Sequence, residues 1–182
     1  GYEYQPGARL SIQPNDQHSV WMSAARAVRT PSQAEDDVVV NQTVNYSGPL
    51  PVLVTVRGDS NFDSEELIAL EAGYRSRPIQ SLSFDLAGFY NIYDDLSSSE
   101  QGALDFSAFP AYIIQPITFG NKLEGVTYGF EVSTTWQAAE WLRFQASYSF
   151  LRVHLNAESD STATGDGENV ENSTPRGIAY LR

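Results

Sequence analysis

The chain has 182 residues, of which 41% are hydrophobic, and its 23 acidic and 11 basic residues give a formal net charge of −12. This balance argues against nucleic-acid binding, because contacts to phosphate need clustered lysine and arginine. No stretch approaches the roughly 18 consecutive apolar residues of a membrane-spanning helix. Without cysteine there is neither a disulfide framework nor a thiolate metal site. The chain starts at Gly1 with no signal-peptide pattern, so we expect it to be a piece of a longer protein.

Apolar and polar residues alternate with a period of two along much of the chain, which predicts β-strands with one apolar and one polar face. In chain order, the expected strands are residues 9–13, 18–29, 65–75, 80–93, 125–136, 141–154 and 176–182. A short β-rich run at 52–56 predicts a further small strand inside a long connection. Several of these strands reach about a dozen residues, whereas the usual length in globular proteins is roughly five to six.

The connections between the expected strands are lopsided. Short turns fall at 14–17, 76–78 and 137–140, and long connections fall at 30–63, 95–121 and 156–174. All short turns lie at one end of the meander and all long loops at the other, which is typical of outer-membrane barrels. We therefore expect the turns in the periplasm and the loops outside the cell. The predicted fold is all-β: an antiparallel up-and-down meander of about seven long strands that forms part of a transmembrane β-barrel wall.

Strand parity assigns each side chain to one of two faces. The apolar face, which we expect to contact lipid, comprises Phe84, Leu86, Tyr90, Phe130, Val132, Trp136, Leu142, Phe144, Tyr148 and Phe150. The polar face, which we expect to line the lumen, comprises Ser83, Asp85, Glu131, Arg143, Gln145 and Ser147. Trp136 and Trp141 flank a short turn, where an interfacial aromatic girdle is expected.

Candidate ligand-binding residues lie in the long connections, because loops on a rigid scaffold usually carry binding. Phe106, Phe109 and Tyr112 supply aromatic surface in the second connection, and such rings grip a planar ligand or a sugar with a low entropy cost. The alternative is that these rings pack against neighbouring loops and close the barrel mouth. Asp36 and Asp37 lie in the acidic first connection, where simple solvation of the loop is the alternative to a cation site.

Ion pairs are expected where arginine lies close to the apolar face. Arg26 and Arg29 lie on the outer half of a strand, and an unpaired guanidinium facing lipid would be costly. We expect Arg26 or Arg29 to point inward or into the loop base and to pair with carboxylates of neighbouring strands. Glu71 is the nearest candidate partner, and contact with a plug domain is the alternative role.

No catalytic or metal-binding residue is expected. The two histidines, His18 and His154, lie at opposite strand ends with no acidic partner at a catalytic spacing. A water-filled lumen explains carboxylates on the polar face, such as Glu71, Asp85 and Glu131, more simply than glycoside hydrolysis does. The sequence therefore predicts neither an enzyme nor a cofactor.

Five stretches of the chain occur in an order that is typical of one family. They are SVWMSAARAVRTPS at 19–32, NFDSEELIALEAGYR at 61–75, FYNIYDDL at 89–96, YGFE at 128–131 preceded by Asn121 and Gly125, and STPR at 173–176. No single stretch is specific, but together they cover nearly the whole chain. In this order they resemble the barrel of TonB-dependent outer-membrane receptors. Among these receptors, the sequences of the stretches are most similar to those of receptors for iron complexes.

The resemblance implies a barrel of about 22 strands whose lumen is closed by a separate plug domain. Residues 1–182 would then be a single partial barrel segment, about a third of that wall. It further implies a bacterial outer membrane, contact with outer-membrane lipid, TonB as a partner through the missing plug region, and a ferric siderophore or similar small ligand. Haem, cobalamin and carbohydrate stay open as ligands, and the acidic loops argue against an anionic ferric catecholate.

Two other classes of protein stay open. A passive porin-like channel would have a similar wall but no plug. A soluble β-sandwich binding module would bury the apolar strand face, which a barrel turns to lipid.

Overall fold

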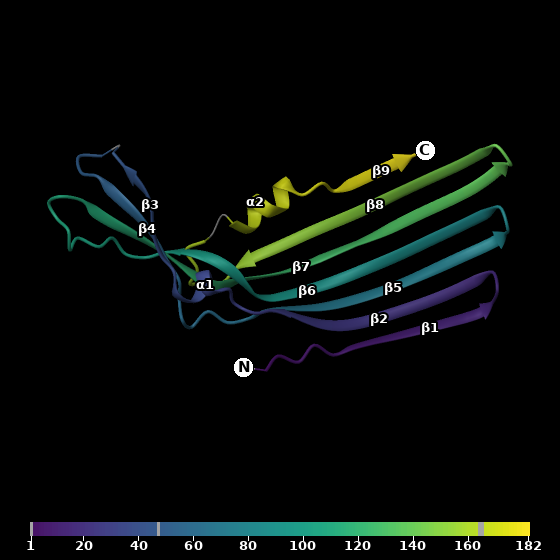
Figure 1. Ribbon diagram of the computed structural model, residues 1–182, viewed down its shortest axis with the longest axis horizontal. Coiled ribbons are helices and arrows are strands. Elements are labelled where there is room, and N and C mark those ends of the chain that lie inside the picture. Colours follow the sequence, from purple (N-terminus) through teal and green to yellow (C-terminus); the bar gives the residue numbers. More distant parts are fainter. Residues whose placement is uncertain (1, 47, 164–165) are drawn as a thin grey trace.

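The computed structural model describes residues 2–46, 48–163 and 166–182. Antiparallel strands form one continuous wall, in the order β1 (Gly7–Asn15), β2 (His18–Arg29), β5 (Glu65–Ile79), β6 (Leu82–Gln101), β7 (Ile113–Ala139), β8 (Leu142–Ala157) and β9 (Gly177–Leu181). Figure 1 shows these strands side by side, with β1 and β9 at the two edges. The predicted all-β antiparallel meander is confirmed.

The remaining elements lie outside the wall. They are α1 (Gln33–Asp37), β3 (Val39–Asn45), β4 (Val52–Arg57) and α2 (Asp166–Ser173). Neither helix within the described part of the chain is long and apolar enough to cross a membrane.

Three tight hairpin turns close the wall at the right-hand end of Figure 1, at 16–17, 80–81 and 140–141. The strand register shifts beside each turn, between Ile12 and Asn15, between Ser76 and Ile79, and between Gln137 and Ala139. The predicted turn at 76–78 is wrong, because these residues still belong to β5. The irregular register there accommodates Pro78, which has no N–H to donate to a strand ladder.

Strand register places the predicted apolar residues on one face of the wall. Leu86 of β6 lies opposite Val132 of β7, which lies opposite Tyr148 of β8. Ring pairs across neighbouring strands share this face: Tyr90–Tyr128, Phe130–Phe150 and Trp136–Phe144, with ring centroids 6.2, 5.6 and 5.8 Å apart. Their shared face is confirmed, and contact of that face with lipid stays a prediction.

The polar residues line up on the other face. Asp85 of β6 lies opposite Ser133 of β7, which lies opposite Ser147 of β8. The described strands form a single sheet, whereas a sandwich needs two sheets packed on each other. The β-sandwich alternative is therefore not favoured.

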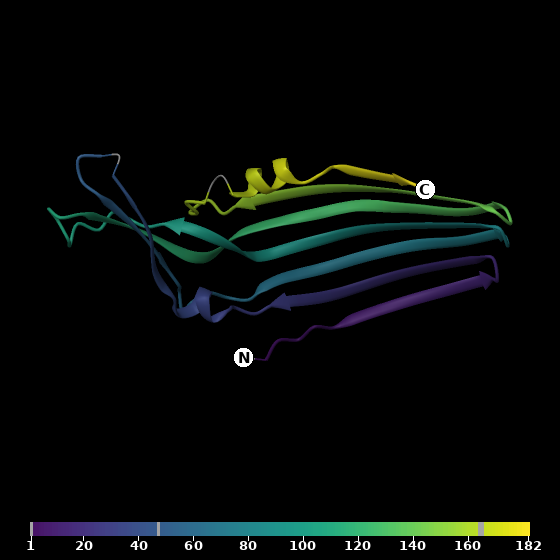
Figure 2. The ribbon, with the colours of Figure 1, turned by 45° about the horizontal axis from the view of Figure 1, so that its top comes forward.

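The strands β6 and β7 continue beyond the wall. Together with β3 and β4 they form a projection, which lies at the left of Figure 2. We call residues 94–122 together with β3 and β4 the arm. Within the arm, β4 pairs in parallel with the start of β7, from Val52 opposite Ile113 to Arg57 opposite Thr118. The predicted small strand at 52–56 is thus present as β4.

The predicted long connection at 95–121 is wrong in extent, because most of it belongs to β6 and β7. The serine run at 97–99 and Pro116 interrupt the alternation from which strands are predicted. The start of β7 is held in a strand conformation by pairing with β4, which comes from a distant part of the chain.

Most of the few buried side chains lie in the arm or where the arm meets the wall. Phe62 and Leu123 are each 7% exposed, Ala163 is 6% exposed, and Thr55 and Ser98 are 4% and 2% exposed. The wall itself buries little, because the described strands form a single sheet with no second layer packed on it. This small core fixes the arm relative to the wall.

Candidate functional site

The three predicted aromatic residues lie at the tip of the arm, the loop at 102–112. The exposed fractions of Phe106, Phe109 and Tyr112 are 55%, 62% and 37%. The Phe109 amide donates to the Phe106 carbonyl at 3.0 Å, and Asp105 and Ile114 exchange backbone hydrogen bonds of 2.9 Å in both directions. The tip therefore presents exposed rings on a hydrogen-bonded backbone, which favours contact at a low entropy cost.

A second hairpin end adds to this surface. The Ile113 amide donates to the Pro51 carbonyl at 3.0 Å, and Figures 1 and 2 show both hairpin ends together at the far end of the arm. Tyr46, on the β3–β4 hairpin, is 75% exposed. The Asp105 carboxylate accepts a hydrogen bond of 2.8 Å from the Ser107 amide, and this bond lowers the pKa of Asp105. The tip thus offers ring stacking together with a charged acceptor.

Asp36 and Asp37 lie on α1, at the other end of the arm. Both are exposed, and α1 contacts the chain just after β4, where the Gly58 amide donates to the Val38 carbonyl at 2.7 Å. The length of β4, about 20 Å for six residues, separates them from the aromatic tip. The structure does not bring the predicted acids and the predicted rings together.

The predicted arginine Arg29 joins the first loop to the wall. Its guanidinium lies 2.6 Å from a Glu65 oxygen on β5 and 2.8 Å from a Glu35 oxygen on α1. The hydrogen bond with Arg29 lowers the pKa of Glu35 to about 2. Glu65 also accepts from the Ser97 amide of β6 at 2.9 Å. Arg29 is thus held at the loop base, within a network that spans three strands and α1.

Arg26 pairs with Glu66, with Nε and Oε2 3.1 Å apart. The expected pairing with Glu71 is wrong, because Arg26 lies opposite Ile68 and Glu71 lies opposite Ser23. This register puts Arg26 on the apolar face, with Ile68 and Tyr90, so Arg26 does not point inward. Glu71 lies on the polar face, as does Arg29 opposite Glu65. Glu71 instead accepts a hydrogen bond of 3.0 Å from the Ser23 hydroxyl.

Two polar side chains to which the sequence assigned no role hold the loops together. The Asn121 carboxamide donates to the carbonyls of Asp63 and Asp95, at 3.0 and 2.7 Å. The Glu100 carboxylate accepts hydrogen bonds from the segment after β8, including one of 2.8 Å from the Ser161 hydroxyl. Their partners lie 26 to 61 residues away in the chain. No local sequence pattern could have indicated them.

The polar face carries a groove of about 380 Å³ that reaches from Arg9 on β1 to Ser149 on β8. The Arg9 guanidinium lies 4.4 Å from the centre of the Trp21 ring, and Arg75 Nε lies 2.7 Å from Asp85 Oδ1. Fixed charges and an aromatic ring therefore line this face at the turn end of the wall.

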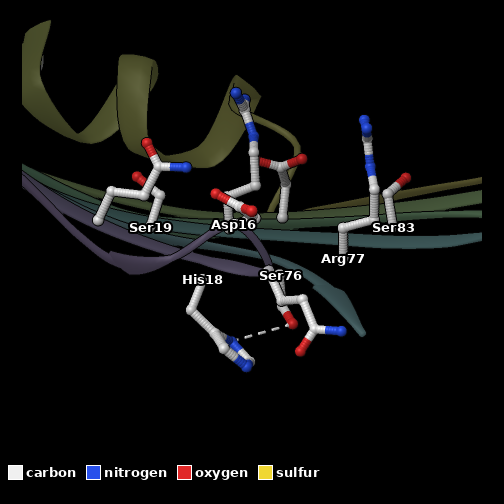
Figure 3. Close-up of a pocket in the computed structure, with 10 residues that line it drawn as sticks. Asp16, His18, Ser19, Ser76, Arg77 and Ser83 are labelled. Atoms are coloured by element: carbon white, nitrogen blue, oxygen red, sulfur yellow. Dashed lines mark hydrogen bonds and ion pairs between the residues drawn. The ribbon is translucent and has the colours of Figure 1, made fainter. Parts of the chain in front are cut away.

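Figure 3 shows a second hollow beside the turns. On one side of the sheet it draws Asp16, Ser19, Arg77 and Ser83. His18 points to the other side, where its Nδ1 lies 2.7 Å from Tyr74 Oη and 3.3 Å from Ser76 Oγ. These contacts give His18 a structural role. In the described ranges no group of three His, Cys, Asp or Glu side chains is placed to hold a metal ion.

The TonB-dependent receptor-like β-barrel family matches residues 1–181, so the chain belongs to this family. The family resemblance carried by the five stretches is confirmed. The family is one of receptors and transporters rather than enzymes, and its place is the bacterial outer membrane. No curated protein sequence matches the chain.

Solved structures of similar fold include the siderophore receptor PirA from Pseudomonas aeruginosa, at 16% identity and a TM-score of 0.67, covering 83% of this chain and 28% of that one. A mutant of the ferric enterobactin receptor PfeA from the same organism gives 16% identity and a TM-score of 0.64, covering 82% and 22%. The FrpB iron transporter from Neisseria meningitidis gives 13% identity and a TM-score of 0.60, covering 86% and 21%. The chain thus spans between 21% and 28% of the length of these structures.

Proposed function

We propose that the chain forms part of the barrel wall and outer loops of a bacterial outer-membrane receptor, which takes up a ferric siderophore or a similarly scarce small ligand with energy delivered by TonB. Membership of the TonB-dependent receptor family over residues 1–181 carries this proposal. The similar folds of two siderophore receptors and an iron transporter support the ligand class. The plug domain, through which TonB acts, belongs to the rest of the protein.

The aromatic tip of the arm is the proposed ligand contact. Phe106, Phe109 and Tyr112 are exposed on a fixed backbone beside the charged Asp105. Rings and an acceptor suit a planar or ring-containing ligand better than they suit an anionic one. Asp36 and Asp37 are the second candidates, because they are exposed at the base of the same arm.

Uptake of radiolabelled iron tests the function. A strain that lacks the receptor gene, complemented with the full-length gene, should take up iron from at least one of a panel of ferric siderophores. Uptake should saturate and should stop when TonB is removed. A porin-like channel would instead let the same compounds pass without TonB, and that result would contradict the proposal.

Deletion of residues 104–112 from the full-length receptor tests the ligand contact. We expect uptake to fall while barrel assembly, read from the heat-dependent shift in gel mobility, stays normal. Unchanged uptake would exclude the tip and leave Asp36 and Asp37 as the next residues to replace.

A further inference from the structure

We propose that Glu100 is a positioning residue that fastens residues 158–163 to the arm and thereby holds the aromatic tip in the orientation that meets the ligand. We call residues 158–163 the strap. The inference rests on the proposed function, because the tip is the proposed ligand contact. Glu100 lies at the end of β6, immediately before the loop that forms the tip. The strap follows β8, so this contact joins segments 61 or 62 residues apart.

Both oxygens of the Glu100 carboxylate accept hydrogen bonds from the strap. Oε1 accepts from the Ser161 hydroxyl at 2.8 Å, and Oε2 accepts from the Thr162 amide at 2.6 Å and from its hydroxyl at 2.9 Å. On the arm, the Ser98 hydroxyl donates to Oε1 at 2.6 Å. The Gln101 amide donates to the Thr162 hydroxyl oxygen at 2.6 Å. One charged group therefore joins donors of both segments, and hydrogen bonds to an ionised acceptor are the stronger kind.

The hydrogen bonds from Ser98 and Ser161 are partly shielded from water, whereas those that involve Thr162 are exposed. Ser98 and Ser161 are 2% and 8% exposed. Burial alone would raise the pKa of Glu100, but the hydrogen bonds from Ser98, Thr162 and Ser161 outweigh it and lower the pKa to about 2. The folded-state pKa is thus below the usual 4.5, so the contribution is complete above about pH 4.5 and is lost as the pH falls through about 2.

A second attachment of the strap is weaker. Lys122 Nζ lies 2.7 Å from Asp160 Oδ2, and the Glu158 amide donates to the Lys122 carbonyl at 2.9 Å. The Asp160 side chain is 69% exposed, so solvent screens this ion pair and it contributes little. Glu100 is therefore the main attachment.

The strap braces β6 in the stretch where β5 no longer pairs with it. β5 pairs with β6 only as far as Asp94, so beyond that residue β7 is the strand neighbour of β6. Past Gln101, the described backbone contacts of the tip to β7 are the Gly102 amide to the Pro116 carbonyl, at 3.0 Å, and the pair between Asp105 and Ile114. Without the strap, the tip would keep these bonds, the hydrogen bond of 2.9 Å from the Gln115 side chain to the Gly102 carbonyl, and the contact of Ile113 with Pro51.

Hydrogen exchange of the full-length receptor in detergent tests the brace without any ligand. The E100A variant should raise the exchange rates of the Thr162 and Gln101 amides by about tenfold or more, because hydrogen bonds to a charged group are lost. The rates at Asp105 and Ile114, in the tip, should rise with them. E158Q is the matched control, since it removes a carboxylate of the strap that makes none of these hydrogen bonds, and it should leave all four rates unchanged.

Two results would overturn the inference. One is unchanged exchange at the tip in E100A, because the strap would then not brace it. The other is an equal effect of E158Q, because charge rather than hydrogen bonding would then be the cause. If E100A assembles poorly, the double variant S161A/T162V removes the same hydroxyl donors from the strap side and should give the same loosening of the tip.

Uptake of radiolabelled iron from the siderophore panel separates this inference from the proposed function. E100A should raise the half-maximal concentration about tenfold and leave the maximal rate unchanged, because a loosened tip must be ordered on binding while the barrel stays intact. If the tip loosens and the half-maximal concentration does not change, Glu100 does not position a ligand contact. A wild-type receptor that takes up no siderophore would contradict the proposed function, and the exchange rates would still decide whether Glu100 braces the tip.

Discussion

Tyr148 and Ser147 are neighbours on β8 whose side chains lie on opposite faces of the wall. Tyr148 shares its face with Val132 and with the ring of Phe130, 6.0 Å away between centroids. We expect Tyr148→Arg to cost about 2–4 kcal/mol, because it lies midway along the wall and would place a charge in the centre of the bilayer. Urea unfolding of the full-length receptor in lipid vesicles measures this cost.

Two control variants test separately which face of the sheet contacts lipid and how the cost depends on depth in the bilayer. Ser147→Arg should be tolerated, since position 147 lies on the polar face, which we expect to line the lumen. Phe144→Arg, on the lipid side but nearer the turn, should cost less than Tyr148→Arg, because the penalty falls toward the interface. A larger loss for Ser147→Arg than for Tyr148→Arg would mean that the two faces are exchanged.

Gly129 allows β7 and β8 to approach closely. A Cβ at this position would overlap the Phe150 carbonyl oxygen and would lie 2.8 Å from the Phe89 ring. Gly129→Ala should therefore destabilise the receptor by about 1–3 kcal/mol, since a backbone atom cannot move aside as a flexible side chain can. Gly88→Ala is the control, because the nearest atom there is 3.7 Å away. Thermal unfolding compares the two variants, and equal midpoints would contradict this packing.

The loop that follows β2 contains one short helix with a well-defined cap. Ser32 and Glu35 form a capping box at the start of α1, and Glu35 also pairs with Arg29. The pKa of Glu35, about 2, lies below its usual 4.5, so this pair stabilises α1 fully above about pH 4.5 and loses its effect as the pH falls through about 2.

Hydrogen exchange, corrected for its intrinsic pH dependence, should show constant protection of α1 between pH 7 and pH 5 and a loss only near pH 2. At pH 7, Glu35→Gln should already show the lower protection, because it removes the charge that Arg29 and the cap hold. Protection that falls between pH 7 and pH 5 would contradict the role of Glu35.

The strands of the wall could be predicted because each carries its own alternation, and parity then placed residues such as Phe130 and Tyr148 correctly. The arm could not be predicted, because β4 pairs with the start of β7 across more than fifty residues, between Val52 and Ile113. The turn after β5 was misplaced because proline usually marks a turn, whereas Pro78 lies at an irregular register.

The candidate site was only partly predictable for the same reason. Phe106, Phe109 and Tyr112 are close in sequence, so their common location followed from the sequence. The partner of Arg26 could not be predicted from the sequence, because the choice of Glu66 over Glu71 depends on the exact register of β2 against β5. The contacts of Glu100 with Ser161 depend on how two distant loops meet.

The acidic residues of the molecule lie mainly in its long loops. There, Glu35, Glu100 and Asp105 are held ionised by their hydrogen bonds. The polar face of the wall carries both signs of charge, with Arg9 and Arg75 beside Asp85 and Glu131. We therefore expect the outer surface to attract cationic or neutral ligands more readily than anionic ones. Within the siderophore panel, hydroxamate complexes should be taken up at lower concentrations than triply charged catecholates, and the reverse order would contradict this expectation.

We infer that this sheet is a stretch of transmembrane barrel wall whose aromatic face contacts lipid. Single cysteines at positions 143–150 of β8, each carrying a nitroxide, test it in the full-length receptor in vesicles, since the chain contains no cysteine of its own. Access of oxygen, which concentrates in lipid, should peak at the even positions. Access of a water-soluble nickel chelate should not follow those peaks. Oxygen peaks at the odd positions, or the absence of a period of two, would contradict the account.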